Sequence, residues 1–314
     1  MNIKEIFDIC SANGRRPLMI SSGNSAVVAV PGMEGRLFFG YNSEAVSLFR
    51  REAAENISNT RTGYFNPGGD GLWPAPEGTK FGYEYSTGSW RVPSSLVSAQ
   101  YEVVSCSSDS FEIAAEIDLI NNQQLGIPCR FIRRASIREV DGAAVIEQFA
   151  AIEYIGSCEL SPEVFSLAPW SLSQFTVNER TIARFGEPGA PVRDLYMPSG
   201  ELLASDGKVV TMKHDTVNRI QLALPEKSGF VELLLPDRNL QITRTSEALA
   251  DGLHAIDIAD APPDQAPGEA VRFSIYNDPS GFMELEAVGG CTDGILPGTV
   301  LGVNIKDVIK KLED

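Results

Sequence analysis

Short runs of β-branched and aromatic residues recur along the whole chain, and clusters of Gly, Pro, Asn and Asp separate them. In most of these runs apolar and polar residues alternate. This is typical of half-buried strands, because successive side chains point to opposite faces. The pattern predicts an all-β protein. We interpret as strands residues 25–30, 36–41, 100–108, 110–119, 129–140, 143–155, 208–214, 219–224, 229–235, 240–249, 270–278 and 281–290.

Helical patterns are confined to short segments, residues 3–10, 45–56 and 308–314, and these do not alternate with strands as in a parallel α/β fold. No repeat of about forty residues is present, which argues against a propeller. The strands therefore favour a large antiparallel sandwich. The length of 314 residues fits one large β domain or two domains of ordinary size.

The chain carries 42 acidic and 26 basic residues, a formal net charge of −16 at pH 7. Such a charge repels phosphate backbones and anionic lipids, so we expect neither nucleic acid nor a membrane as partner. No apolar run approaches the roughly 18 residues of a membrane span. The N-terminus also lacks the apolar core of a secretory signal, which predicts a cytoplasmic location.

The sequence offers few of the residues and motifs that hold metals or cofactors. Its five cysteines are scattered and form no CxxC pair, so we expect reduced thiols rather than disulfides or a zinc site. It has only two histidines, and no P-loop, GxGxxG, GxSxG or HExxH motif. We therefore predict neither a cofactor nor a metal.

Residues 59–93 contain FNPGGDGLWPAPEG, in which glycines and prolines disfavour regular structure. We expect a long ordered loop outside the sheets here, and another over residues 187–205. The first loop carries Trp73, Glu77 and Trp90. Aromatic rings stack on the C–H faces of sugars and carboxylates accept from their hydroxyls, so this mixture suits a carbohydrate site. The alternative is that Trp73 closes the end of the sandwich as a hydrophobic lid.

Two further segments place polar and aromatic side chains on one strand face. In SLAPWSLSQF, alternation puts Trp170 and Gln174 on the same face of the strand. They would either contact a ligand, or Trp170 would be a core residue whose indole N–H donates a hydrogen bond to a neighbour. In GFMELEAVGG, Glu284 and Glu286 share a face about 7 Å apart, close enough to perturb each other's protonation. One of them would act as a general base; the alternative is a solvated strand face.

The segments GGDGLWPAPE, LAPWSLSQF and GFMELEAVGG, in this order and with a following LPG, resemble the signature segments of a bacterial family in the galactose mutarotase-like superfamily. That family carries a GG-x-x-LW-PAP motif. The start SAVVAVPGMEGRLFF extends the resemblance to nearly the whole chain. The resemblance implies one domain over residues 1–314. Its fold would be a supersandwich of two large antiparallel sheets, with a ligand groove on the concave side of one sheet.

Aldose epimerases of that superfamily use a carboxylate base on the anomeric hydroxyl and a histidine acid toward the ring oxygen. Glu286 is similar to the glutamate of the epimerase LE-x-Q motif, with Glu284 as the alternative. His214 is the candidate acid, although TMKHDTVN around it lacks the Asn and the aromatic residue of the N-H-x-x-(F/Y) motif. Tyr276, Arg36 or a water would otherwise supply this proton, a contribution of about a hundredfold in rate.

The resemblance implies a carbohydrate ligand bound without a cofactor. Trp73 would stack on a pyranose ring and Glu77 would accept from its hydroxyls. Two functions stay open, a non-catalytic sugar-binding protein and an aldose 1-epimerase. A structural or partner-binding protein that uses its acidic surface is a third.

Overall fold

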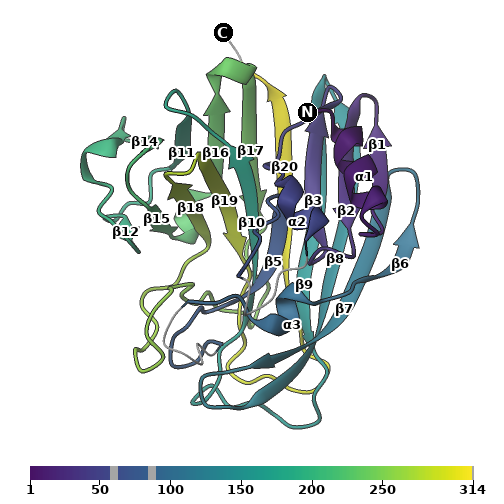
Figure 1. The fold of residues 1–314 in the computed structure, drawn as a ribbon. Coiled ribbons are helices and arrows are strands. Elements are labelled where there is room, and N and C mark those ends of the chain that lie inside the picture. The colour runs from purple at the N-terminus through teal and green to yellow at the C-terminus, as the bar shows by residue number, and fades with distance from the viewer. Residues whose placement is uncertain (57–62, 84–89, 313–314) are drawn as a thin grey trace.

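The computed structural model describes residues 1–56, 63–83 and 90–312, which form two large antiparallel β-sheets (Figure 1). The first sheet contains, in spatial order, β1 (Leu18–Ser22), β2 (Ser25–Val30), β3 (Arg36–Tyr41), β5 (Asp70–Ala75), β10 (Ala168–Thr176), β19 (Phe282–Val288), β18 (Phe273–Asp278), β15 (Ile220–Leu224) and β12 (Arg193–Asp194), with β4 (Glu44–Ala45) paired to β3. The second contains β13 (Leu203–Ser205), β14 (Val209–Lys213), β11 (Ile182–Gly186), β16 (Phe230–Leu235), β17 (Leu240–Ser246), β20 (Val300–Lys311), β9 (Ala143–Tyr154), β8 (Gly126–Val140), β7 (Ser110–Ile120) and β6 (Glu102–Cys106). The predicted all-β, two-sheet sandwich is confirmed.

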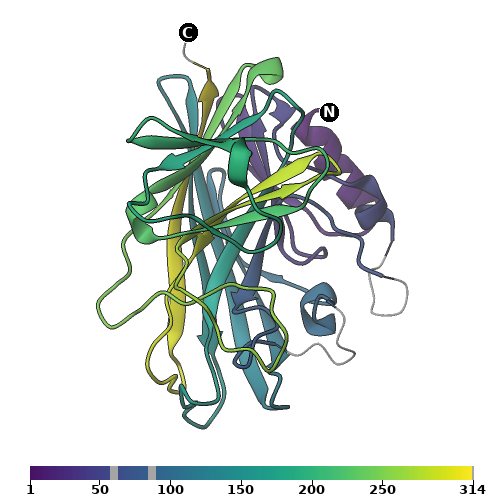
Figure 2. The same ribbon diagram turned by 90° about the vertical axis from the view of Figure 1, so that its left-hand side faces the viewer.

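The helices are short and few. They are α1 (Ile3–Ala12), α2 (Arg51–Glu55), α3 (Ser94–Val97) and the 3₁₀ turns η1 (Gly200–Leu202), η2 (Glu226–Ser228) and η3 (Pro236–Arg238). None of the described helices is both long and apolar enough to cross a membrane. In Figures 1 and 2 both chain ends lie at the upper end of the molecule, and the long connection between β17 and β18 lies at the lower end.

The two sheets differ in how they are buried. In β7, β9 and β20 of the second sheet, buried and more exposed residues largely alternate, as expected when one face packs on a core and the other meets water. In the first sheet β2, β3, β5 and β19 are buried along their whole length. Their second face is therefore covered too, by helices at one end and by loops around a cavity at the other.

Helix α1 covers the outer face of β2 and β3 (Figure 1). Asn2 caps it by accepting from the Lys4 N–H at 2.8 Å, and Ile3, Ile6 and Cys10 recur on one side, which is buried. The helix expected over residues 3–10 is thus confirmed with a slightly later end. Of the helix expected over residues 45–56, only α2 is helical.

The helix expected over residues 308–314 is wrong, because these residues up to Lys311 continue strand β20. Leu301, Val303, Ile305 and Ile309 point inward at every second position, with Asp307 in the same series. The alternation begins well before residue 308, so the last residues alone resembled a helical turn. β1 and β11 were also missed.

The loop expected over residues 59–93 is wrong in its middle, because Asp70–Ala75 forms β5 inside the first sheet. Prolines are tolerated there for a structural reason. β5 pairs along its length with β10 but with β3 only at Asp70, opposite Leu37. Beyond that residue its other edge has no β3 partner, so Pro74 removes no ladder hydrogen bond on that side. Residues 59–62 and 84–89 of the expected loop lie outside the described residues.

A buried ionic cluster joins the two sheets behind β5, β10 and β19. Asp70 pairs with Arg133 and Arg244, and Arg244 also pairs with Asp307 at 2.8 Å. All four side chains are at most 1 % exposed. Arg244 further donates to the backbone carbonyl of Leu285 at 3.0 Å, which ties the second sheet directly to β19.

Candidate functional site

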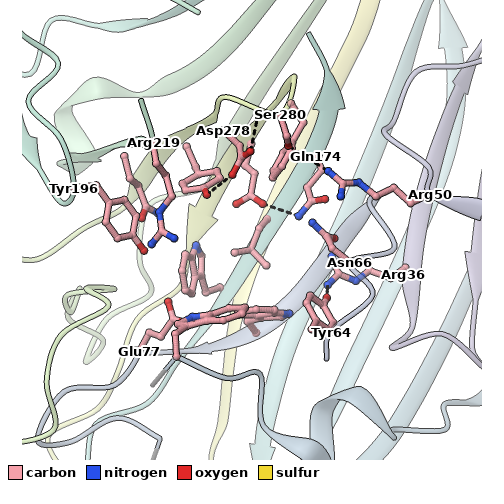
Figure 3. Close-up of a pocket in the computed structure, with 18 residues that line it drawn as sticks. Arg36, Arg50, Tyr64, Asn66, Glu77, Gln174, Tyr196, Arg219, Asp278 and Ser280 are labelled. Atoms are coloured by element: carbon pink, nitrogen blue, oxygen red, sulfur yellow. Dashed lines mark hydrogen bonds between the residues drawn. The ribbon is translucent and has the colours of Figure 1, made fainter. Parts of the chain in front are cut away.

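A cavity of about 320 Å³ lies on the face of the first sheet that points away from the second (Figure 3). Alternation explains this placement. The Ser171 hydroxyl accepts a hydrogen bond from Arg244 of the second sheet, so Trp170, Leu172 and Gln174, at every second position of β10, point the other way. Glu284 on β19 is directly opposite Gln174 and points to the same face. The volume is within the range of about 300–1,000 Å³ typical of small-molecule sites.

The strand register places four cavity residues in one row. Gln174 on β10 is opposite Glu284 on β19, Glu284 is opposite Tyr276 on β18, and Tyr276 is opposite Gln221 on β15. All four line the cavity. Since directly opposite side chains lie about 4.5–5.5 Å apart at Cβ, a ligand the size of one ring would contact several of them.

Aromatic residues form one wall. Trp73 and Trp170 are directly opposite on β5 and β10, with ring centroids 6.3 Å apart and planes at 87°. Trp90 stacks on Trp73 at 6.3 Å and 25°, and Tyr64 meets both edge-on. Trp73 is only 8 % exposed whereas Trp90 is 44 % exposed. Trp73 therefore lines the cavity and also packs in the hydrophobic core. Trp90 is the most exposed indole of the wall.

Glu77 holds this wall in place from one end (Figure 3). It accepts a 2.5 Å hydrogen bond from the Trp90 indole N–H and is 4 % exposed. Because a carboxylate strengthens the bond that it accepts, Glu77 orients Trp90 over Trp73. The sequence prediction that Glu77 accepts from ligand hydroxyls stays a prediction.

Glu284 and Glu286 form a buried carboxyl pair on β19. Glu286 is fully buried, accepting from the Trp170 indole N–H at 3.0 Å and from the Gln221 amide at 3.2 Å. Glu284 is 8 % exposed, lines the cavity and accepts from the Gln174 amide at 2.6 Å. The alternative of a solvated strand face is therefore wrong.

Burial raises the pKa of both carboxyls of this pair, and the repulsion of Glu284 adds to the rise for Glu286, whose pKa lies well above its usual value. The two carboxyls also interact directly with each other. We conclude that they titrate as a pair that retains one proton more readily than ordinary carboxyls do. Of the two, Glu284 is the one that meets the cavity.

Arg36 and the GGDG segment fit together on the opposite side of the cavity from Tyr196 and Arg219 (Figure 3). The Arg36 guanidinium pairs with Glu34 at 2.9 Å and donates to the Tyr64 hydroxyl at 2.6 Å. A Cβ on Gly71 would lie 2.6 Å from this guanidinium. Gly71 therefore lets a buried arginine lie against β5, and Arg36 is already occupied by protein partners.

The other glycines of the segment serve the chain path. Gly68 and Gly69 have φ values of 80° and 69°, a region that favours glycine. They turn the chain into β5, so that Asp70 reaches the ionic cluster and Trp73 reaches the cavity. The motif thus combines a turn, a buried charge, space for Arg36 and an aromatic wall.

Arg219 and Arg50 add cations that the sequence did not single out. Arg219 lies 3.7 Å from the centroid of the Tyr196 ring and pairs with Asp260 at 3.7 Å. Arg50 lies 5.4 Å from the centroid of Phe282. They come from opposite sides of the cavity (Figure 3). Arg219 directly precedes the short strand β15 and Arg50 directly precedes helix α2, and neither belongs to a motif, so only the fold reveals that they share a site.

Tyr276 and Asp278 lie two residues apart on β18 and face the cavity together. The Tyr276 hydroxyl donates to Asp278 at 2.8 Å. Burial opposes ionisation of Asp278, but hydrogen bonds from Ser280 and Tyr276 outweigh it and lower its pKa. Burial raises the pKa of Tyr276 further above neutral, so this phenol keeps its proton.

His214 does not line this cavity. Its Nδ1 lies 2.5 Å from the Asn277 side chain oxygen, and Asn277 points to the other face of β18 from Tyr276 and Asp278. The structure thus brings together Arg36, Trp73, Glu77, Trp90, Trp170, Gln174, Tyr276 and Glu284, places Glu286 directly behind Glu284, and leaves His214 outside. Over the described ranges, no cluster of three or more His, Cys, Asp or Glu residues could hold a metal.

The sequence matches no protein-family model and no curated protein. Solved structures share the fold. A galactose mutarotase-like protein from Lactobacillus casei ATCC 334 aligns with a TM-score of 0.56 and 10 % identity over 93 % of this chain and 99 % of its own. An Escherichia coli K12 protein with a proposed aldose 1-epimerase activity aligns with a TM-score of 0.55 and 11 % identity over 94 % and 99 %.

A galactose mutarotase related enzyme from Lactobacillus acidophilus gives a TM-score of 0.53 and 9 % identity over 95 % of this chain and 98 % of its own. At such identities the likeness shows the fold alone. The chain therefore has the galactose mutarotase-like β-sandwich fold that the sequence resemblance implied. The GG-x-x-LW-PAP motif itself is not tested by these alignments.

Proposed function

We propose that this protein binds a carbohydrate in the cavity, with the sugar ring against the tryptophan wall and its hydroxyls on the Gln174, Glu284 and Tyr276 row. The observation that supports this most is that one cavity joins Trp73, Trp90 and Trp170 to Glu284. Flat indoles suit the C–H face of a pyranose, and amides and carboxyls suit its hydroxyls. The shared fold with mutarotase-like proteins is consistent with it.

Titration calorimetry over a panel of aldohexoses tests this proposal. Because Trp90 is the most exposed indole of the wall, Trp90→Ala should weaken binding about tenfold or more, which corresponds to about 1.4 kcal/mol. Phe149→Ala is the control, since Phe149 lies under Arg134 on the second sheet, away from the cavity. If no sugar binds, or if both variants bind like the parent, the proposal is wrong.

An aldose 1-epimerase is the second candidate, favoured by the raised pKa of the buried Glu284–Glu286 pair at the cavity wall. The Glu284 carboxylate would take the proton of the anomeric hydroxyl while the bond between C1 and the ring oxygen breaks. The ring oxygen would take a proton from an acid, and reclosure on the other face reverses both transfers. Tyr276, directly opposite Glu284, is the candidate donor, and its hydroxyl would turn from Asp278 to the ring oxygen.

Polarimetry of freshly dissolved aldoses separates the two candidates. An epimerase should accelerate mutarotation, and Glu284→Gln should reduce the rate by about a hundredfold or more. Binding without any acceleration would leave the non-catalytic function. The same assay with Tyr276→Phe tests the acid, because this variant keeps the ring but loses the proton.

A further inference from the structure

The charges around the cavity are unevenly compensated. Arg36 is paired with Glu34, and Arg219 is paired with Asp260 and stacked on Tyr196. Of the cationic groups that line the cavity, these two are therefore neutralised by carboxylates just behind them. Arg50 is the third.

Two carboxyls on the β18–β19 side have no such partner. Among the described residues, neither Glu284 nor Asp278 forms an ion pair with a Lys, Arg or His. Arg50 is near enough to act on Asp278, and Arg36 acts on Glu284, but Arg36 forms its ion pair with Glu34 and not with Glu284. The cavity thus carries excess negative charge at its centre.

A neutral acceptor beside Glu284 also lacks a hydrogen-bond donor. The NH2 group of the Gln174 side chain donates to Glu284. The carbonyl oxygen of the same side chain is buried and has no hydrogen-bond partner within the described part of the chain. Asp278 is a diagonal neighbour of Glu284 across the strand pair and perturbs its protonation. A group that carries positive charge and several N–H donors would satisfy this side.

An aromatic wall stands beside these acceptors. Trp73, Trp90 and Trp170 line the same cavity, and indole faces attract cations. An ammonium group, which has three donors and no acceptor, matches the acids and the rings at once. A carboxylate or phosphate on the ligand would instead meet Glu284 and Asp278 as like charges.

We propose that the Glu284 and Asp278 side of the cavity binds a protonated amine, so that the preferred ligand is an amino sugar. This rests on the proposed carbohydrate site and assigns its specificity. The hexose ring lies against the tryptophan wall and the ammonium group contacts Glu284. Acidic sugars are rejected by the same charges.

The test is a charge series on one ring, measured by calorimetry at pH 6.5. The ligands are 2-amino-2-deoxyglucose, 2-amino-2-deoxygalactose and 2-amino-2-deoxymannose, their N-acetyl derivatives, the parent hexoses, glucuronate and glucose 6-phosphate. We expect at least one amino sugar to bind tenfold or more tightly than both its parent hexose and its N-acetyl derivative. Glucuronate and glucose 6-phosphate should bind more weakly than glucose.

Glu284→Gln keeps the size and the bond from Gln174 but removes the charge, so the ratio of amino-sugar to hexose affinity should fall toward one. Glu116→Gln, which changes an exposed acid on β7, should leave that ratio as in the parent. Hexoses that bind as well as every amino sugar, an acidic sugar that binds best, or a ratio unaffected by Glu284→Gln would overturn this inference alone. Absence of binding by the whole panel would overturn the carbohydrate site as well.

Discussion

Gln174 and Glu284 face each other across β10 and β19, and the Gln174 amide donates a 2.6 Å hydrogen bond to the Glu284 carboxyl. On the next position of the same face, Glu286 is held by the Trp170 indole and the Gln221 amide. Each carboxyl of the pair is thus positioned by neutral groups, Glu284 by Gln174 and Glu286 by Trp170 and Gln221. These hydrogen bonds fix where the carboxyls point without neutralising them.

The first prediction concerns Glu286→Gln and the pH dependence of stability. Burial and Glu284 raise the pKa of Glu286 above its ordinary 4.5 in the folded protein. The folded state then holds this proton more tightly than the unfolded chain. Its stabilising contribution is fully present below about pH 4.5 and is lost as the pH rises through the folded pKa.

Glu286→Gln imitates the protonated form, because its carbonyl can accept from Trp170 and Gln221 while its amide donates to Glu284. The parent should therefore lose stability relative to the variant as the pH rises above about 4.5, by on the order of 1 kcal/mol. Urea unfolding at several pH values measures this difference. Curves that stay parallel over that range would show that the pair holds no extra proton.

The second prediction concerns Gly71. In Gly71→Ala the added methyl would lie 2.6 Å from the Arg36 guanidinium, which is 1 % exposed and held by Glu34. Since neither group has room to move, the variant should lose about 1–3 kcal/mol of stability and should bind sugar more weakly. Gly126→Ala is the matched control, because nothing lies within 4 Å of a Cβ there. Equal effects of the two substitutions on thermal unfolding would contradict this reading of the motif.

Alternation made much of the fold predictable from sequence. The strands predicted over residues 110–119, 129–140 and 143–155 coincide closely with β7, β8 and β9. These long strands have one solvent-exposed face and one buried face, so their sequences alternate. β5 was not predictable in the same way. Its residues are buried on both faces and include Pro74, and only the pairing with β10 along one edge makes them a strand.

Part of the site could be predicted from local sequence patterns. Trp73, Trp170 and Glu284 belong to unusual local patterns, and the fold brings these patterns together through the β5–β10–β19 pairing. The preference for Glu286 as the base rested on resemblance. In the structure Glu286 is fully buried, and Glu284 is the carboxyl that lines the cavity. Arg219 carries no local signal, since its place depends on long-range packing against Tyr196.

The third prediction concerns the ionic cluster behind the site. Arg244→Met removes a fully buried cation and leaves Asp70 and Asp307 with one fewer partner each, so we expect a loss of about 3–5 kcal/mol. Arg180→Met is the control, because Arg180 pairs with Asp237 at the surface with 64 % of its side chain exposed. Such exposed pairs contribute about 0–1 kcal/mol. Chemical denaturation distinguishes the two, and a loss below 1 kcal/mol for Arg244→Met would mean that the cluster does not stabilise the sheet pair.

The fourth prediction separates His214 from the cavity. Its contact with Asn277 belongs to the turn after β14, so His214→Ala should cost about 1–2 kcal/mol of stability through the lost hydrogen bond. Sugar affinity and any mutarotase rate should stay within twofold of the parent, because the ring does not line the cavity. Gln174→Ala should instead weaken sugar binding, since it frees the Glu284 carboxyl from its fixed orientation. A large loss of sugar affinity or rate in a folded His214→Ala variant would return this histidine to the site and contradict the geometry described for β18.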